Sequence, residues 1–325
     1  MLLGLVLALA GCGRAAAQLP KNANEASDRE HFLQHEGRER RYLVHAPAGW
    51  DGKSPLPVVL AFHGGGGRAE LQRTQSGLNA TSDRHKFIVV YPDGTGRSVK
   101  RLLRREEVDV LTWNAGRCCG SAVKENVDDV GFIRALLDAL PKQYAVDTNR
   151  IYATGMSNGA MMAHRVGVEL ADRIAAIAPV AGAIMIDGPE PVRPVPILYF
   201  HGLKDPSAKY EGGPGRLDKT VHRSVAETIA WWVRANHCES QSVETRKETD
   251  CIVERYEPAG AGGAPVVLVK LPEGGHTWPG GVDVTKHLGT GPLIATVSAN
   301  EMMWEFFSKH PLHDGKPPAS RPGKP

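Results

Sequence analysis

The sequence predicts an α/β fold with a mainly parallel sheet and helices on both of its faces. Short, β-branched apolar runs alternate with helix-compatible stretches along most of the 325 residues. This alternation is typical of parallel strands joined by crossover helices. Hydrophobic residues make up 42% of the chain, and no internal repeat is evident. A single domain of about 270 residues with a substantial core is therefore expected.

The expected elements can be placed by their periodicity. The runs expected to be strands are residues 58–62, 87–91, 150–154, 196–200 and 266–271. Apolar residues at 130, 133, 137 and 140 behind the polar Asn126 predict an amphipathic helix with Asn126 as its cap. Residues 225–232 and 301–307 are interpreted as further helices that cover the sheet.

A Gly-Met-Ser-Asn-Gly motif at residues 155–159 lies between a predicted strand and a helix-compatible run. The glycines allow a sharp turn that lifts the Ser157 hydroxyl clear of the strand and brings the following helix N-terminus beside it. In this strand-turn-helix context the motif is typical of the nucleophile elbow of the α/β-hydrolase fold. Ser157 is the predicted nucleophile, and it requires a base, an orienting acid and oxyanion donors.

The predicted oxyanion donors are backbone N–H groups. The strand at residues 58–62 runs into a His-Gly-Gly-Gly-Gly loop at residues 63–67. A Gly-rich loop in this place exposes an N–H toward the developing negative charge. We assign the two donors to Gly65 and Asn158. A phosphate-binding glycine loop is the alternative, but no Lys-Ser or Lys-Thr follows it.

The predicted acid, Asp205, lies on the loop after the strand at residues 196–200. It combines a strand end with turn chemistry. The competing carboxylates, which lack this combination, are Asp187, Glu211 and Asp218.

The predicted base, His276, follows the strand at residues 266–271 and two glycines. Ser157, Asp205 and His276 thus occur in the chain order that the α/β-hydrolase fold uses. His63 and His201 are interpreted as residues that shape their loops.

These motifs together resemble the secreted polyhydroxybutyrate depolymerase-like esterases, a family that includes many bacterial feruloyl esterases. The resemblance covers about residues 40–308 and is carried by the elbow, by Asp205 and by residues 62–66, 112–116, 118–120, 126–132, 200–202 and 274–280. It implies a serine carboxylesterase with Ser157 as nucleophile, Asp205 as orienting acid and His276 as base.

One position departs from the family pattern. Several polymer depolymerases of this group carry a cysteine directly after the His-Gly of the oxyanion loop, where this chain has Gly65. Because of this departure, and because the Trp-Asn and Cys-Cys-Gly segments resemble the feruloyl esterase branch, we expect release of hydroxycinnamates such as ferulate from plant polysaccharide. The alternatives are hydroxyalkanoate oligomers, acetyl-xylan and, in a different class, a non-catalytic glycan-binding surface lipoprotein.

Loop aromatics and a basic segment are candidate substrate contacts. Trp113, Tyr210 and Trp278 are expected either to form an apolar wall for an aromatic acyl group or to pack the loops. The basic cluster within residues 97–105 is either a solvated insertion or a patch that steers acidic polymers toward Ser157.

The first residues are expected to be an export leader. An apolar run at residues 2–10 is too short to span a bilayer. It ends in Leu-Ala-Gly-Cys, which resembles a bacterial lipobox with Cys12 as the lipidated residue; cleavage near Gln18 is the alternative. We therefore divide the chain into a leader at 1–18, a linker at 19–35, a catalytic domain at 36–309 and a Pro-rich disordered tail at 310–325. Export places the protein in the periplasm, on the cell surface or outside a bacterial cell.

Four cysteines remain besides Cys12, which allow three pairings. Cys238 and Cys251 flank a short polar stretch and are expected to form a local bridge. Cys118 and Cys119 are adjacent and are expected to be a vicinal disulfide, a free pair or partners of the other two. Their spacing does not make a four-ligand metal set, and no metal or cofactor is expected.

The expected partner is an ester substrate, polysaccharide-linked or oligomeric. The net charge of +3 is spread along the chain, so nucleic acid is not an expected partner. Membrane attachment is expected only through Cys12, and the catalytic domain is expected to be a monomer.

Overall fold

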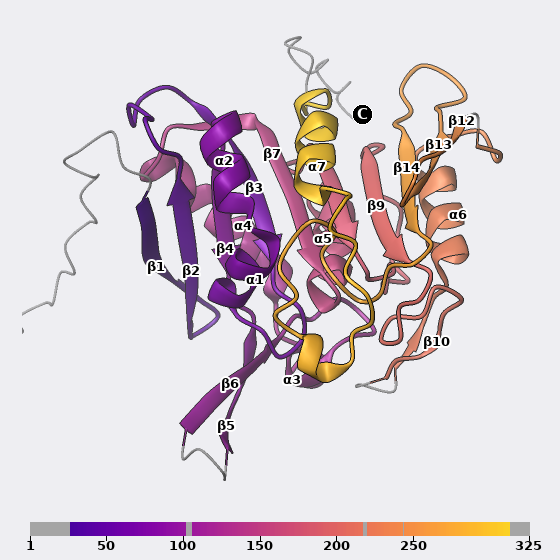
Figure 1. The fold of residues 1–325 in the computed structure, drawn as a ribbon. Coiled ribbons are helices and arrows are strands. Elements are labelled where there is room, and N and C mark those ends of the chain that lie inside the picture. The colour runs from indigo at the N-terminus through magenta and orange to yellow at the C-terminus, as the bar shows by residue number, and fades with distance from the viewer. Residues whose placement is uncertain (1–26, 102–105, 217–219, 243, 313–325) are drawn as a thin grey trace, which may run out of the picture.

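A ten-stranded sheet forms the centre of the protein in the computed structural model, which describes residues 27–101, 106–216, 220–242 and 244–312 (Figure 1). Its strands lie in the order β1 (Ser27–His35), β2 (Arg38–Ala46), β4 (Ile88–Pro92), β3 (Leu56–Phe62), β7 (Val146–Met156), β8 (Ala176–Val180), β9 (Ile197–Gly202), β14 (Val266–Leu271), β13 (Ile252–Tyr256) and β12 (Glu244–Lys247). The central strands from β4 to β14 are parallel, and antiparallel strands flank them at both edges. The α/β-hydrolase arrangement predicted from the sequence is confirmed.

Helices cover both faces of the sheet (Figure 1). Residues of α4 (Asp129–Ala139), α5 (Asn158–Glu169) and α6 (Val225–Ala235) join one apolar core. Residues of α1 (Ala69–Ser76), α2 (Leu78–His85) and α7 (Ala299–Ser308) belong to or flank the other. In β3, Val58, Leu60 and Phe62 enter the first core, whereas Val59 and Ala61 enter the second. This alternation explains why the central strands read as continuous apolar runs.

Smaller elements complete the described chain. A hairpin of β5 (Thr95–Arg101) and β6 (Glu106–Thr112) projects away from the sheet (Figure 1). The remaining elements are α3 (Gly120–Lys124), η1 (Leu140–Lys142), η2 (Lys286–Leu288), and a short strand pair, β10 (Gly213–Pro214) with β11 (Val221–His222). None of the described helices combines the length and apolar character needed to cross a bilayer.

Three boundaries differ from the sequence prediction. Residues 27–35, expected in a linker, form β1, because their backbone pairs antiparallel with β2 along its whole length. The predicted tail begins too early, since the Leu312 N–H donates to the Asn149 carbonyl at 2.7 Å. The cap of α4 is Asp128, whose carboxylate accepts the Gly131 N–H, and not Asn126. The leader, Cys12 and residues 313–325 lie outside the described residues.

Candidate active site

Ser157 lies in a sharp turn between β7 and α5. Its backbone has φ 58° and ψ −122°, a conformation that L-residues rarely adopt. The turn is possible because the flanking positions are glycines: a Cβ on Gly155 would lie 2.5 Å from the Gly159 carbonyl oxygen, and one on Gly159 would lie 2.2 Å from the Phe62 carbonyl oxygen. The predicted elbow geometry is therefore present.

Asp205 and His276 form a buried pair at the same edge of the sheet. Asp205 follows β9 and His276 follows β14, and these strands are parallel neighbours, so the loops after them lie side by side. The His276 Nδ1 atom lies 2.7 Å from the Asp205 Oδ2 atom. The other carboxylate oxygen, Oδ1, accepts the N–H groups of Ser207 and Ala208, both at 2.8 Å. Asp205 is thereby held in one orientation.

The environment of Asp205 keeps it ionised. Burial raises the pKa of its carboxyl, but the nearby His276 imidazole and the hydrogen bonds outweigh burial, so the net pKa lies below its usual value. An ionised carboxylate can both accept the Nδ1–H of the imidazole and stabilise an imidazolium. Of the competing carboxylates, Asp187 pairs with Arg223 at the surface, and Asp218 lies outside the described residues.

His63 and His201 are neutral residues that hold their loops, as the sequence predicted. Burial lowers the pKa of both imidazoles. The His63 Nε2 atom accepts the Gly94 N–H at 3.0 Å. The His201 Nε2 atom lies 2.7 Å from the Ala208 carbonyl oxygen, next to the turn that holds Asp205.

The residues predicted to supply oxyanion donors border the cavity above Ser157. Gly65 and Asn158 both line it. Asn158 is the first residue of α5, so its N–H has no intrahelical acceptor. The positive end of the α5 dipole also points toward this place.

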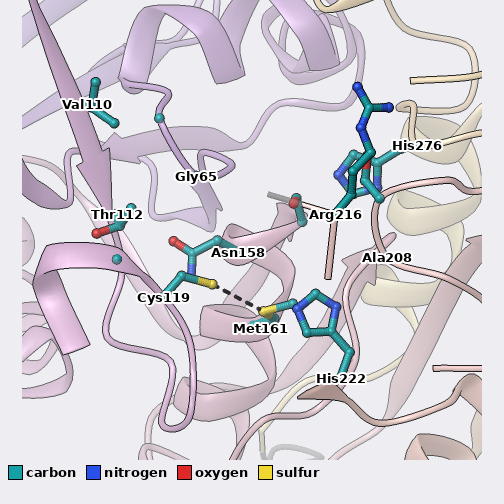
Figure 2. A pocket seen from close by; sticks show the side chains of 14 residues that line it. Gly65, Val110, Thr112, Cys119, Asn158, Met161, Ala208, Arg216, His222 and His276 are labelled. Carbon is teal, nitrogen blue, oxygen red and sulfur yellow. Dashed lines mark hydrogen bonds between the residues drawn. The ribbon is translucent and has the colours of Figure 1, made fainter. Parts of the chain in front are cut away.

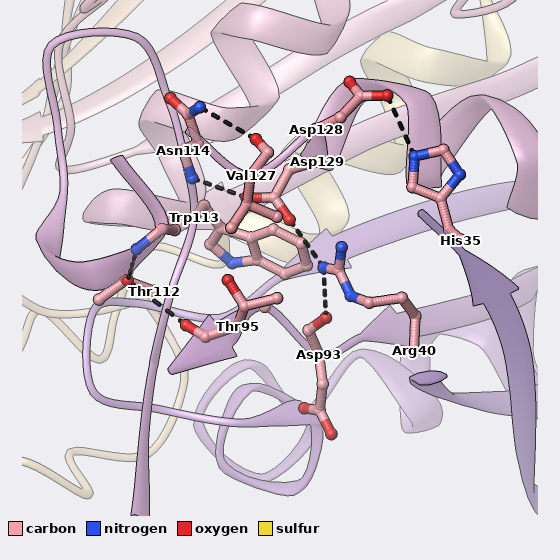
Figure 3. A network of polar contacts seen from close by, with 12 residues as sticks. His35, Arg40, Asp93, Thr95, Thr112, Trp113, Asn114, Val127, Asp128 and Asp129 are labelled. Carbon is pink, nitrogen blue, oxygen red and sulfur yellow. Dashed lines mark hydrogen bonds and ion pairs between the residues drawn. The ribbon is translucent and has the colours of Figure 1, made fainter. Parts of the chain in front are cut away.

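The Asn158 side chain ties the elbow to the segment that precedes α3. Its Oδ1 atom accepts the Trp113 N–H at 2.7 Å, and its Nδ2 atom donates to the Trp113 carbonyl at 3.1 Å. The neighbouring Asn114 N–H donates to Asp129 at 2.7 Å, and Asp129 pairs with the buried Arg40 at 2.7 Å (Figure 3). A buried polar network therefore fixes the backbone of residues 113–114 beside the nucleophile.

Two cavities meet at Ser157. The larger has a volume of about 380 Å³ and is lined by residues that include Val110, Thr112, Cys119, Met161, Ala208 and His222 (Figure 2). The smaller has a volume of about 120 Å³ and is lined by residues that include Leu71, Gln75, Met156, Thr285, Leu288 and Thr290. Residues that line both are Gly65, Ser157, Ser207, Arg216 and His276.

The structure thus brings Ser157, His276, Gly65 and Asn158 to one cavity, with Asp205 behind His276. Among the described residues no hydrogen bond joins the Ser157 hydroxyl to the imidazole. Such contacts are often long without substrate and shorten in the substrate complex. Sequence reasoning missed Met161 as a lining residue, although it lies in the first turn of the helix that follows Ser157.

Trp113, Tyr210 and Trp278, expected either to form an apolar wall or to pack the loops, line neither of the two cavities beside Ser157. Trp113 is fully buried, packs edge-on against Phe62, and donates its Nε1–H to the His63 carbonyl at 3.1 Å. Trp278 is also buried and donates to Asn300 at 2.9 Å. Tyr210 packs against His201 and lines neither cavity. These three side chains hold loops in place, because each contacts another residue in the interior of the fold.

The expected bridge between Cys238 and Cys251 is absent from the structure. Cys238 and Cys251 are free thiols. Cys238 pairs with Pro258 beyond one end of β13, whereas Cys251 precedes the other end, so a strand of about 3.3 Å per residue separates them beyond the reach of a disulfide. In the structure the sulfur atoms of Cys118 and Cys119 are joined in a disulfide across a cis peptide bond.

Comparison with solved structures gives the class of the fold. The chain superimposes on the acetyl xylan esterase from Aspergillus awamori with a TM-score of 0.57 and 14% sequence identity, over 86% of this chain and 99% of that chain. An S-formylglutathione hydrolase from Agrobacterium tumefaciens superimposes with a TM-score of 0.53 and 13% identity, over 89% of this chain and 97% of that chain. The fold is the α/β-hydrolase fold of serine esterases.

The sequence gives the family. Residues 41–209 match the family model described as esterase PHB depolymerase, and the chain belongs to this family. Feruloyl esterase B of Piromyces equi is 30% identical over 245 residues, which cover 73% of this chain and 42% of that protein. Poly(3-hydroxyalkanoate) depolymerase C of Paucimonas lemoignei is 30% identical over 139 residues, which cover 42% of this chain and 30% of that protein. The chain spans less than half the length of these two relatives. It is a carboxylic ester hydrolase.

Proposed function

We propose that the protein is a serine esterase that releases hydroxycinnamate groups from polysaccharide by two-step acyl transfer. The single observation that carries the chemistry is the meeting of Ser157 and the His276–Asp205 pair at one cavity. Similarity to a protein named feruloyl esterase B supports the choice of acyl group.

In the first step, His276 removes the Ser157 proton as the hydroxyl attacks the ester carbonyl. The Nδ1 atom of His276 is engaged by Asp205, which leaves Nε2 for this proton. The N–H groups of Gly65 and Asn158 hold the oxyanion, and each such donor typically lowers the barrier by about 3 to 4 kcal/mol. The imidazolium then protonates the departing alcohol.

In the second step, the same imidazole takes a proton from water as the water attacks the acyl carbon; the bond to the Ser157 oxygen then breaks, the imidazolium returns the proton to that oxygen, and the acid leaves. Asp205 keeps the ring oriented and stabilises its positive charge throughout. This step needs no residue beyond those of the first, because the same oxyanion donors serve both tetrahedral intermediates.

We assign the acyl group to the larger cavity and the alcohol to the smaller one. A volume of about 380 Å³ falls within the range of ligand sites. The smaller cavity has hydroxyl and amide side chains on Thr285, Thr290 and Gln75. The Thr290 Oγ1 atom is buried without a hydrogen-bond partner in the described part of the chain. A sugar hydroxyl would satisfy it, which favours a carbohydrate alcohol.

Purified protein assayed with methyl ferulate, p-nitrophenyl butyrate and a hydroxybutyrate oligomer tests this proposal. We expect turnover of methyl ferulate with a higher kcat/KM than that of the oligomer. Preference for the oligomer would replace the proposed acyl group by hydroxyalkanoate. A folded protein that turns over none of the three would favour a glycan-binding lipoprotein instead.

Export is a second part of the proposal and rests on the leader sequence alone. Residues 2–12 carry the apolar run and the lipobox-like Cys12. Expression of the full chain in a bacterium, followed by fractionation, tests it: the wild type is expected in the membrane fraction and Cys12→Ala in a soluble one. Equal distribution of the two would remove lipidation from the proposal.

A further inference from the structure

A cluster of sulfur-containing side chains forms one side of the larger cavity. Cys118, Cys119, Met161 and Met185 pack together with Ala115 in an apolar cluster separate from the two main cores. Only Cys119 and Met161 of this cluster line the cavity. Their sulfur atoms lie 3.9 Å apart. Figure 2 shows the two side chains pointing toward each other. The cavity therefore has a wall made of two adjacent sulfur atoms.

This wall has a fixed place relative to the nucleophile. Met161 lies one turn after Ser157 on α5, and its N–H donates to the Ser157 carbonyl at 3.0 Å. Ser157 and Met161 line the same cavity. An acyl group bound to Ser157 and extending into the larger cavity would therefore have Met161 as one of its walls.

The other half of the wall is held by the backbone. The Cys119 N–H donates to the Trp113 carbonyl at 3.0 Å, the same oxygen that accepts the Asn158 side-chain amide. The Ala115 N–H donates to the Cys118 carbonyl at 2.6 Å. The Cys119 sulfur is also bonded to Cys118, so it cannot rotate away from the cavity. Cys119 is thereby positioned by the residue that follows the nucleophile.

We propose that Cys119 and Met161 form the acyl-selecting wall of the active site, against which the ring of a hydroxycinnamoyl group packs. Sulfur is polarizable and makes favourable contacts with aromatic rings, typically at the ring edge. A short aliphatic acyl group gains much less from such a wall. The inference rests on the proposed function, because it assumes that Ser157 carries the acyl group.

The experiment compares the ratio of kcat/KM for methyl ferulate to kcat/KM for p-nitrophenyl butyrate among variants. Met161→Leu keeps the volume of the side chain and removes the sulfur, and Cys118→Ala/Cys119→Ala removes the other half of the wall. We expect each to lower the ratio about three- to tenfold, which lies within the range that sulfur–aromatic contacts produce. Met185→Leu is the matched control, because Met185 belongs to the same cluster but does not line the cavity; its ratio should stay within twofold of the wild type.

Each outcome separates the two proposals. If the wild type hydrolyses methyl ferulate but Met161→Leu keeps the wild-type ratio, the sulfur wall is wrong while the proposed function stands. If Met185→Leu lowers the ratio as much as Met161→Leu, the effect belongs to packing and the wall is again wrong. If the wild type hydrolyses neither ester, the proposed function itself fails. If the double cysteine variant does not fold, the ratio of kcat/KM values measured for Met161→Leu tests the sulfur wall by itself.

Discussion

The two cavities beside Ser157 are built in different ways. The larger one is walled by the segment from Val110 to Gly120, which buried polar groups tie to the elbow. The smaller one is walled by α1 and by residues 285–290, where Thr290 carries a buried hydroxyl that has no partner in the described chain. Of the residues that line both cavities, Gly65, Ser157 and His276 follow the parallel strands β3, β7 and β14. Under the proposed function, the strand ends place the reacting groups, whereas the segments on either side of them select the acyl group and the alcohol.

The largest effect on catalysis is expected from the residues that the reaction of every ester requires. Asp205→Asn should lower kcat about 10⁴-fold for every ester, because the amide cannot stabilise the imidazolium and favours the wrong tautomer of His276. Steady-state assays with methyl ferulate and p-nitrophenyl butyrate measure it. A loss of kcat for only one of the two esters would show that Asp205 affects the binding of that ester and not the shared catalytic step.

The wall of the larger cavity depends on a buried ion pair. Arg40→Met should lower the free energy of unfolding by about 3 to 5 kcal/mol, since it leaves the buried Asp129 carboxyl without its guanidinium partner. Urea unfolding measures the change. Arg134→Ala breaks an exposed pair with Asp172 and serves as the control, with a loss below about 1 kcal/mol.

A double variant sharpens this second prediction. Arg40→Met/Asp129→Leu removes both charges and should recover part of the lost free energy of unfolding. If the double variant is no more stable than Arg40→Met alone, the buried charge is not the cause of the loss.

A buried histidine on the helix that follows Ser157 predicts a dependence of stability on pH. Burial lowers the pKa of His164 on α5 to about 3. Its Nδ1 atom accepts the indole N–H of Trp232, and its Nε2 atom is hydrogen-bonded to the Gly182 carbonyl. The unfolded chain takes up a proton below about pH 6.5 that the folded chain does not. Stability should therefore fall as pH drops from about 6.5 toward 3, by up to about 1.4 kcal/mol per pH unit from this residue. Urea unfolding between pH 7 and 4 should show that the free energy of unfolding of His164→Gln depends less steeply on pH than that of the wild type. An equally steep dependence in the variant would show that other groups cause it.

The smallest effect is expected in the smaller cavity. Thr290→Val keeps the shape and removes the hydroxyl, so it should raise KM about fivefold for a feruloylated sugar and leave methyl ferulate unchanged. Thr290→Ser retains the hydroxyl and should behave as the wild type. An equal rise in KM for both esters would remove the proposed role in binding the alcohol.

The sequence allowed the centre of the site to be predicted better than its walls. Ser157, Asp205 and His276 each follow a recognisable strand, and parallel strands end at one edge of a sheet, so their proximity follows from the fold. The sequence left open whether Trp113 and Trp278 form the wall or pack the loops, because a loop aromatic that donates to an internal acceptor has the same sequence pattern as an exposed one.

Other features depend on contacts that no local pattern reveals. The pairing of β1 with β2 and the separation of Cys238 from Cys251 are set by strand register across the sheet. The same holds for Arg216 and Thr290, which reach the site from loops far from Ser157 in the chain. Spacing within one segment cannot encode such placements.

The central claim is that Ser157 forms the acyl-enzyme between the two cavities. The most direct measurement treats the wild type and Ser157→Ala with a serine-directed phosphonate, maps the adduct by peptide mass spectrometry, and follows turnover of p-nitrophenyl butyrate. We predict one adduct, on Ser157, and a loss of at least about 10⁴-fold in kcat for a variant that remains folded. An adduct on another residue, or turnover by Ser157→Ala within tenfold of the wild type, would contradict the account.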